Sequence, residues 1–202
     1  MPELLAGPLA DATGLLLGIL QLEPGAPRTR EDADDLLDLP GDDLFHTDLL
    51  LAAHCLTGSP RVADLALRRE IIRTVWELLE TSRYRGERGR AAEAIVGVLG
   101  SEARMSEAMA YISDASRGES ARIALVDALA AHGGRNVGER LLGVLSLRPE
   151  LPDALRDALV TALGALHVEA AVPYLLGQLS EPGGRLDAPA ISALGGAGGP
   201  SR

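Results

Sequence analysis

The stretch ARIALVDALAAHGGRNVGERLLGVLS, residues 121–146, decides the fold because a second copy of it follows in the chain. The copy, LRDALVTALGALHVEAAVPYLLGQLS, occupies residues 155–180, about 34 residues further on and without a gap. About twelve of roughly 26 positions are identical. Sequence rich in Ala and Leu raises such counts by chance, but the matched pair Arg122 and Arg156 is harder to explain that way. We interpret the two stretches as successive structural repeats.

Each repeat has the pattern of two short helices around a turn. Leu125, Ala128 and Leu129 recur at the spacing of three to four residues that lines one face of a helix. The His-Gly-Gly sequence at 132–134 then indicates a turn, where glycine accepts positive φ without steric cost. In the second copy we expect Pro173 in the first turn of the second helix, where its missing N–H costs little.

Weaker copies extend the array in both directions. They pair residues 91–99 with 105–112 and 44–56 with 70–79, and residues 190–194 begin a further first helix. The predicted fold is all-α, an α-solenoid of stacked antiparallel helical hairpins over residues 44–194. We expect an N-terminal helical segment and acidic linker over 1–43 and a disordered Gly/Pro tail over 195–202. Because the array stops inside a hairpin, the chain is expected to be a piece of a longer protein.

The composition favours helices and disfavours polyanionic partners. Aromatic residues make up 2% of the chain, so the core must consist of Leu, Ala, Val and Ile. The formal net charge of −10 argues against nucleic-acid binding, which requires basic groups to neutralise phosphates. The main local exception is a set of four arginines, which we interpret as solvated side chains where one helix ends and the next begins: Arg83, Arg85, Arg88 and Arg90.

The low cysteine content and the N-terminal sequence indicate the cellular compartment. Its single cysteine, Cys55, excludes an internal disulfide and fits a reducing cytoplasm. The N-terminus has no basic region of a secretory signal, and its apolar stretch at 15–20 is too short to span a bilayer. We therefore expect a cytoplasmic protein that does not associate with membranes.

The histidines are the main candidates for chemistry. His46 and His54 lie eight residues apart on an expected helix starting near Leu44, whereas a metal site favours ligands four apart and needs a third from elsewhere. His132 and His167 fall in related turns and have no evident Ser or Cys nucleophile beside them. We predict that His46 is a polar residue near a helix start, that His54 is a packed or half-exposed helix residue, and that His132 and His167 are turn residues, with a pH-sensitive pair as the alternative for the last two. We predict no catalytic residue, metal or cofactor.

Two further features have simple structural interpretations. Trp76 falls at helical spacing with Ile72, Val75 and Leu79, which predicts core packing rather than a binding anchor. The acidic run at 31–43 lacks the spacing of a calcium-binding loop and is interpreted as a solvated linker.

A partner surface is expected on the second helices. In solenoids of helical hairpins, repeated second helices usually line the concave face, and their positions outside the core form an extended binding surface. The helical register assigns five residues to this surface: Glu107, Glu139, Arg140, Tyr174 and Gln178.

The sequence also resembles known families. The repeats at 121–146 and 155–180 resemble short HEAT repeats of the PBS-lyase-like kind, in which a first helix ending in AL-G-L leads into an AVPYLL-type second helix. The segment DLFHTDLLLAAHCL at 43–56, followed by SPRV at 59–62, resembles the start of the helical region of bacterial NACHT-type signalling ATPases. That resemblance implies a regulatory array next to an upstream ATPase domain in a parent chain, sensing a ligand or protein partner. The chain contains no lysine, so no phosphate-binding loop residue can be assigned to it.

Two alternatives stay open. One is a HEAT-type accessory protein resembling the phycobilin lyase family, which would bind a tetrapyrrole. The other is a free-standing adaptor whose open end is closed by dimerisation. The leading prediction is a non-catalytic regulatory or scaffolding module that binds another protein.

Overall fold

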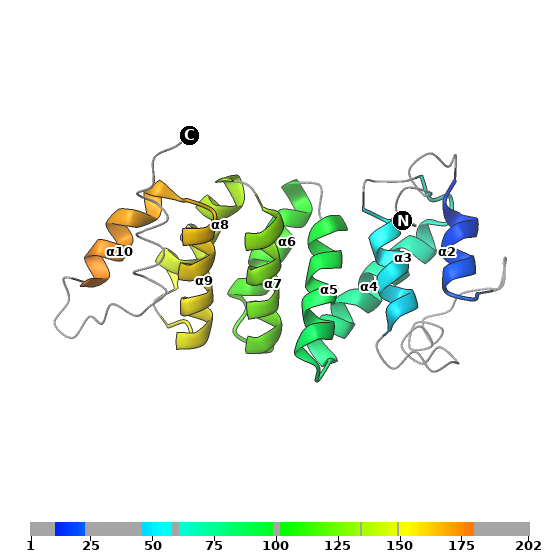
Figure 1. The fold of residues 1–202 in the computed structure, drawn as a ribbon, viewed down its shortest axis with the longest axis horizontal. Helices are drawn as coiled ribbons and strands as arrows, with labels where there is room; N and C mark the ends of the chain where they lie inside the picture. Colours follow the sequence, from blue (N-terminus) through cyan, green and yellow to red (C-terminus); the bar gives the residue numbers. More distant parts are fainter. Residues whose placement is uncertain are drawn as a thin grey trace. The chain divides into compact units, whose positions relative to one another are not determined.

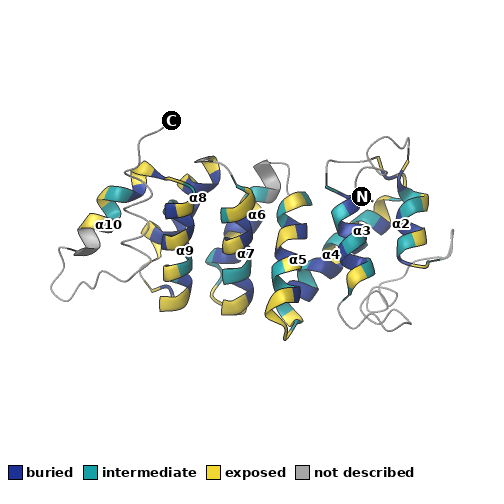
Figure 2. Ribbon diagram, in the orientation of Figure 1, coloured by how far each residue is buried: buried dark blue, intermediate teal, exposed yellow. Residues whose placement is uncertain are grey.

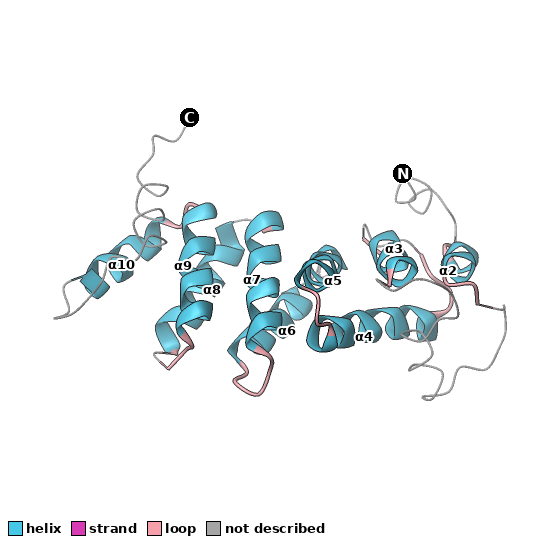
Figure 3. Cartoon of the chain, turned by 60° about the horizontal axis from the view of Figure 1, so that its bottom comes forward, coloured by secondary structure: helices cyan, strands magenta, loops and turns pink. Residues whose placement is uncertain are grey.

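A computed structural model describes residues 11–22, 46–57, 61–98, 102–133, 135–148 and 150–179 of the chain. These ranges are helical and contain no strand, which confirms the all-α prediction for this part of the protein (Figure 3). They form two compact units, residues 1–104 and 105–202. The acidic run at 31–43, residues 190–194 and the tail at 195–202 lie outside the described residues.

The first unit contains α2 (Thr13–Ile19), α3 (Thr47–Cys55), α4 (Leu65–Thr81) and α5 (Arg85–Val98). Its helices pack in the pairs α2–α3, α3–α4, α3–α5 and α4–α5. Within this unit α3 and α5 run alongside each other, and α4 lies across both of them (Figures 1 and 3). The pair α3–α4 therefore differs from the antiparallel hairpin expected. With 17 residues against the 9 of α3, α4 is long enough to cover both neighbours.

Helix α4 shows how the sequence sets an element's limits. Asp64 precedes the helix and its side chain accepts a hydrogen bond from the Leu67 N–H at 2.9 Å, which satisfies one of the free N–H groups of the first turn. Apolar residues then follow at helical spacing, with Leu67, Ile71 and Val75 buried along one face. Burying each such side chain contributes about 1.5–3 kcal/mol.

Trp76 lies at the edge of that buried face. It is half-buried, as is Ile72, whereas Val75 and Leu79 are buried. The prediction that Trp76 packs in the core with all three residues is therefore correct only in part. At 100° per residue, positions 72 and 76 are rotated away from the line through 71, 75 and 78, so they face the margin of the core.

The second unit contains most of α6 (Glu102–Ser113), followed by α7 (Glu119–His132), α8 (Arg135–Leu147) and α9 (Asp153–Ala165). The chain continues through a short 3₁₀ turn, η2 (Glu169–Ala171), into α10 (Val172–Leu179). The first helices of the two sequence repeats, α7 and α9, pack side by side, and α8 packs against both (Figure 1).

The core of the second unit follows the predicted stripes. Leu125, Ala128 and Leu129 are buried on α7, and Leu159, Ala162 and Leu163 occupy the matching buried positions on α9 in the same order. Buried residues alternate with exposed ones around both helices (Figure 2). Pro173 lies in the first turn of α10, as predicted.

In the turn after α7, Gly133 differs from the prediction in its backbone, and Gly134 lies outside the described residues. Gly133 has φ −85° and ψ 159°, an extended conformation that any residue adopts, so a positive φ is not the reason for this glycine. A Cβ at Gly133 would instead overlap the carbonyl oxygen of Leu129 and approach Val137 to 2.9 Å. Glycine is required here because the chain turns back closely onto the end of α7.

Candidate functional site

The second helices of the second unit carry the predicted partner-binding residues. Glu107 on α6 and Glu139 on α8 are exposed, and Arg140 and Tyr174 are half-exposed. Gln178 lies on α10, but its side chain is outside the described part of the chain. The prediction that these side chains form a binding surface remains a prediction, although four of them are open to solvent.

One contact joins two of these helices in repeat register. The Arg140 Nη1 on α8 donates to the Ser106 hydroxyl on α6 over 3.4 Å, between residues that are 34 positions apart. That interval equals the sequence repeat, and Tyr174 on α10 stands the same interval beyond Arg140. Arg140 and Ser106 therefore lie next to each other at positions one repeat interval apart. Ser106 was not among the predicted residues, and the repeat interval was the signal that would have identified it.

The repeated arginines hold the first helices in place. Arg122 is buried on α7 and donates from Nε to the Ile112 carbonyl oxygen at 2.7 Å. Its counterpart Arg156, more exposed, donates to the Leu151 carbonyl oxygen and to the Asp153 carboxylate, both at 3.2 Å. In each repeat, the arginine binds a backbone carbonyl that precedes its own helix. These residues support the surface but do not form part of it.

In the first unit, a buried carboxylate connects three helices. Glu87, in the first turn of α5, is 3% exposed, and its Oε1 lies 2.7 Å from His46 Nδ1 at the start of α3. Its second oxygen accepts a hydrogen bond from Ser82, which follows α4. The sequence placed Glu87 among solvated arginines, and nothing in the pattern indicated that its side chain would be buried.

This cluster does not have the geometry of a catalytic triad. In a triad the histidine lies between the nucleophile and the carboxylate, so that it can take the serine proton. Here Ser82 and His46 both bind the carboxylate of Glu87, and the histidine is not the partner of the serine hydroxyl. The arrangement instead gives a buried carboxyl group two polar partners and ties the helix ends together.

The other histidines and the cysteine occupy separate places. His54 Nδ1 bonds the Leu50 carbonyl oxygen on its own helix at 3.1 Å, and Cys55 is buried. His132 is the last residue of α7, and His167 lies beyond the end of α9 with φ 52°, so the two do not occupy equivalent turn positions. Among the described residues, no three His, Cys, Asp or Glu side chains gather in a metal-binding group.

The α4–α5 corner carries the basic stretch noted in the sequence. Arg83, Arg85 and Arg90 are exposed, and Tyr84 is 62% exposed. Arg88 differs from them because its Nη1 donates to the Ser82 carbonyl oxygen at 2.6 Å. The interpretation of all four arginines as solvated side chains is therefore wrong for Arg88, which fixes the corner.

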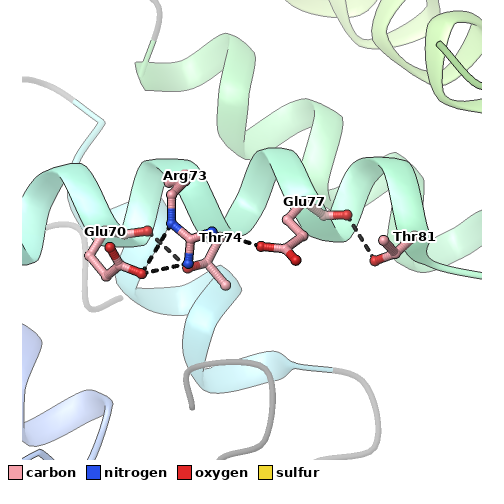
Figure 4. A network of polar contacts seen from close by, with 5 residues as sticks. All are labelled: Glu70, Arg73, Thr74, Glu77 and Thr81. Carbon is pink, nitrogen blue, oxygen red and sulfur yellow. Dashed lines mark hydrogen bonds and ion pairs between the residues drawn. The ribbon is translucent and has the colours of Figure 1, made fainter. Parts of the chain in front are cut away.

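Unlike the exposed arginines of this corner, Arg73 on α4 forms ion pairs with neighbouring side chains. Arg73 bonds Glu70 and Glu77, one turn to either side, at 2.8 Å and 2.9 Å (Figure 4). The hydrogen bonds that Arg73 donates to the Glu70 carboxylate raise the pKa of Arg73. Thr74 and Thr81 bond backbone carbonyl oxygens one turn earlier on the same helix (Figure 4). Such exposed ion pairs contribute about 0.3–0.5 kcal/mol each, so the network gives the helix modest support.

Within the described ranges, no helix combines the length and the apolar character needed to cross a bilayer. No protein-family model, curated protein or solved structure matches this chain.

Proposed function

We propose that the chain is a non-catalytic protein-interaction module, built from HEAT-like repeats, that binds its partner through the second helices of residues 105–202. The contact between Arg140 and Ser106 carries this proposal. It joins equivalent positions of successive second helices, as a solenoid requires, and the side-by-side packing of α7 and α9 supports the same arrangement for the first helices.

The exposed positions on these helices suit protein recognition. Acidic, basic and aromatic side chains follow one another: Glu107, Glu139, Arg140 and Tyr174. Tyrosine and arginine are the residue types most often responsible for binding energy in protein interfaces. Mixed charge of this kind favours a protein partner over a polyanion, because a nucleic acid would be repelled by the two glutamates.

The wider setting is also a proposal. The resemblance of residues 43–62 to the helical region of bacterial NACHT-type ATPases favours a regulatory module that acts with an ATPase domain in the cytoplasm. In that setting the partner surface would transmit the state of a bound protein to the ATPase. The buried single cysteine is compatible with a reducing compartment.

Site-specific photo-crosslinking in the cells that produce the protein tests this function. A photoreactive residue replaces Glu139, Arg140 or Tyr174 in turn, and the control carries it at Asp157, exposed on the first helix α9. We expect one protein to be captured from the three second-helix positions and not from Asp157. Capture from all four positions alike, or from none, would contradict a second-helix binding surface. Mass spectrometry of the captured protein then shows whether it contains an ATPase core.

A further inference from the structure

The α4–α5 corner presents two arginine side chains that have no partner among the described residues. Arg83 and Arg85 are exposed, and neither side chain makes a hydrogen bond or an ion pair with another residue of the described ranges. Residues 82–90 hold four arginines and one glutamate, in a chain whose formal net charge is −10. We call Arg83, Tyr84 and Arg85 the basic corner.

The one acidic residue within this stretch is turned inward. Glu87 follows Arg85 by two positions, yet it is 3% exposed and bound to His46 and Ser82. Its carboxyl group therefore contacts residues inside the fold and does not form a surface ion pair with the basic corner. The positive end of the α5 helix dipole lies at the same place, next to the negative end of the α4 dipole, so the positive charge of the corner comes from its arginines.

The backbone of the corner is held firmly while its side chains remain exposed. The Ser82 hydroxyl accepts a hydrogen bond from the Tyr84 N–H at 3.1 Å, and the Tyr84 carbonyl oxygen accepts one from the Arg88 N–H at 3.0 Å. The Arg88 guanidinium fixes the Ser82 carbonyl oxygen from the other side. Because the backbone is already fixed, less conformational entropy is lost when a ligand binds. This favours a role of the corner in recognition.

Tyr84 adds an apolar element between the two charges. It is among the few large hydrophobic residues of the described ranges that stay exposed. A tyrosine between two arginines combines the residue types that most often dominate binding energy. A ligand that fits would carry negative charge on both sides of an apolar group.

We propose that the basic corner binds an acidic peptide segment of a partner protein, with carboxylates on Arg83 and Arg85 and an apolar side chain on Tyr84. A nucleic acid fits less well, because stable binding uses many phosphate contacts and the rest of the chain is strongly acidic. A short acidic segment needs only the local charge. This surface belongs to residues 1–104, whereas the second-helix surface belongs to residues 105–202.

Fluorescence anisotropy with a labelled peptide of repeated Glu-Glu-Leu tests the proposal. We expect the unaltered protein to bind it, and the double variant R83A/R85A to bind about tenfold more weakly, with less dependence on ionic strength. The matched control is R61A/R69A, which removes two exposed arginines elsewhere in the same unit and the same amount of charge. Y84A should weaken binding about fivefold and leave the salt dependence unchanged.

Several outcomes would overturn the proposal. One is that the unaltered protein does not bind the peptide. Another is that R61A/R69A loses as much peptide affinity as R83A/R85A, which would mean that the peptide is attracted by overall charge and not by a defined site. A third is tighter binding of a labelled oligothymidylate than of the peptide, which would indicate a nucleic-acid surface. Circular dichroism of each variant confirms that the helices are retained, because all substituted side chains are exposed.

Discussion

The buried Arg122 at the start of α7 donates a hydrogen bond to the carbonyl oxygen of Ile112 in the last turn of α6, at 2.7 Å. The last four carbonyl groups of a helix have no partner within it, so the guanidinium satisfies one of them and places positive charge at the negative end of the helix dipole. The side chain therefore fixes the connection between two successive helices. Its repeat counterpart Arg156 makes a similar bond to Leu151.

Replacing Arg122 with methionine should lower the free energy of unfolding by about 2–3 kcal/mol, because the Ile112 carbonyl loses its partner in a buried place. Urea denaturation followed by circular dichroism measures the change. Arg156→Met is the matched control and should cost less than about 1 kcal/mol, since water can replace the arginine at a partly exposed site. Equal losses in the two variants would mean that burial is not the deciding factor.

Replacing two glycines of α8 with alanine should change the stability of the protein in opposite directions. A Cβ at Gly138 would overlap the Val168 side chain, so Gly138→Ala should destabilise the protein by about 1–3 kcal/mol. A Cβ at Gly143 meets no atom within 4 Å, so Gly143→Ala should stabilise it by about 0.5–1 kcal/mol through helix propensity. Thermal unfolding of both variants gives the comparison. A gain in stability for Gly138→Ala would show that there is room for a Cβ between Gly138 and the Val168 side chain, contrary to the structure.

His167 occupies a position that favours glycine. Its φ is 52°, and the bonds from His167 N–H to Gly164 and from Val168 N–H to Leu163 form the C-terminal cap of α9. His167→Gly should therefore stabilise the protein by about 1 kcal/mol, because glycine enters the left-handed region without the Cβ clash. Chemical denaturation tests this expectation. His132→Gly, at the end of α7, should instead lose stability, because His132 has helical backbone geometry.

The carboxylate of Asp11 ties α2 to the segment before α4. Its pKa lies below the ordinary value of 3.8, first because the Thr13 hydroxyl donates a hydrogen bond to the carboxylate and then because the Ala63 N–H does the same. Because the folded pKa is depressed, the contribution to stability is present above the unfolded pKa and disappears as the pH falls through the folded pKa. The melting temperature of Asp11→Ala should lie below that of the unaltered protein at neutral pH. The gap should narrow below pH 3.8. A gap that is constant with pH would show that the charge of Asp11 is not involved.

The buried carboxylate of Glu87 should matter more than an exposed one on the same helix. Glu87→Ala removes the partner of His46 and Ser82, and we expect a loss of about 2–4 kcal/mol. Glu93→Ala, exposed on α5, should change the free energy of unfolding by less than about 0.5 kcal/mol. Denaturant unfolding distinguishes the two. A loss as small as that of Glu93→Ala would mean that the cluster does not hold the three helices together.

By itself, the sequence determined the helices and their buried faces. Apolar periodicity predicted Leu125, Ala128 and Leu129 as one face of a helix, and all three are buried. Repetition at about 34 residues also predicted which helices are equivalent, and α7 and α9 indeed pack together. This success has a local cause, because helix formation and the side on which apolar residues fall depend on neighbours within one or two turns.

Only the tertiary structure decided what the polar side chains contact. Glu87 and Arg85 belong to one basic stretch of sequence, yet Glu87 is buried against His46, 41 residues away, whereas Arg85 stays in solvent. In the same way, Arg140 meets Ser106 from the preceding second helix, and α4 lies across α3 and α5. Such contacts depend on how helices distant in sequence are placed. A charged residue carries no local signal that distinguishes a solvated position from a paired one, because the energies of the two states depend on burial and on partners that only the packed chain brings together.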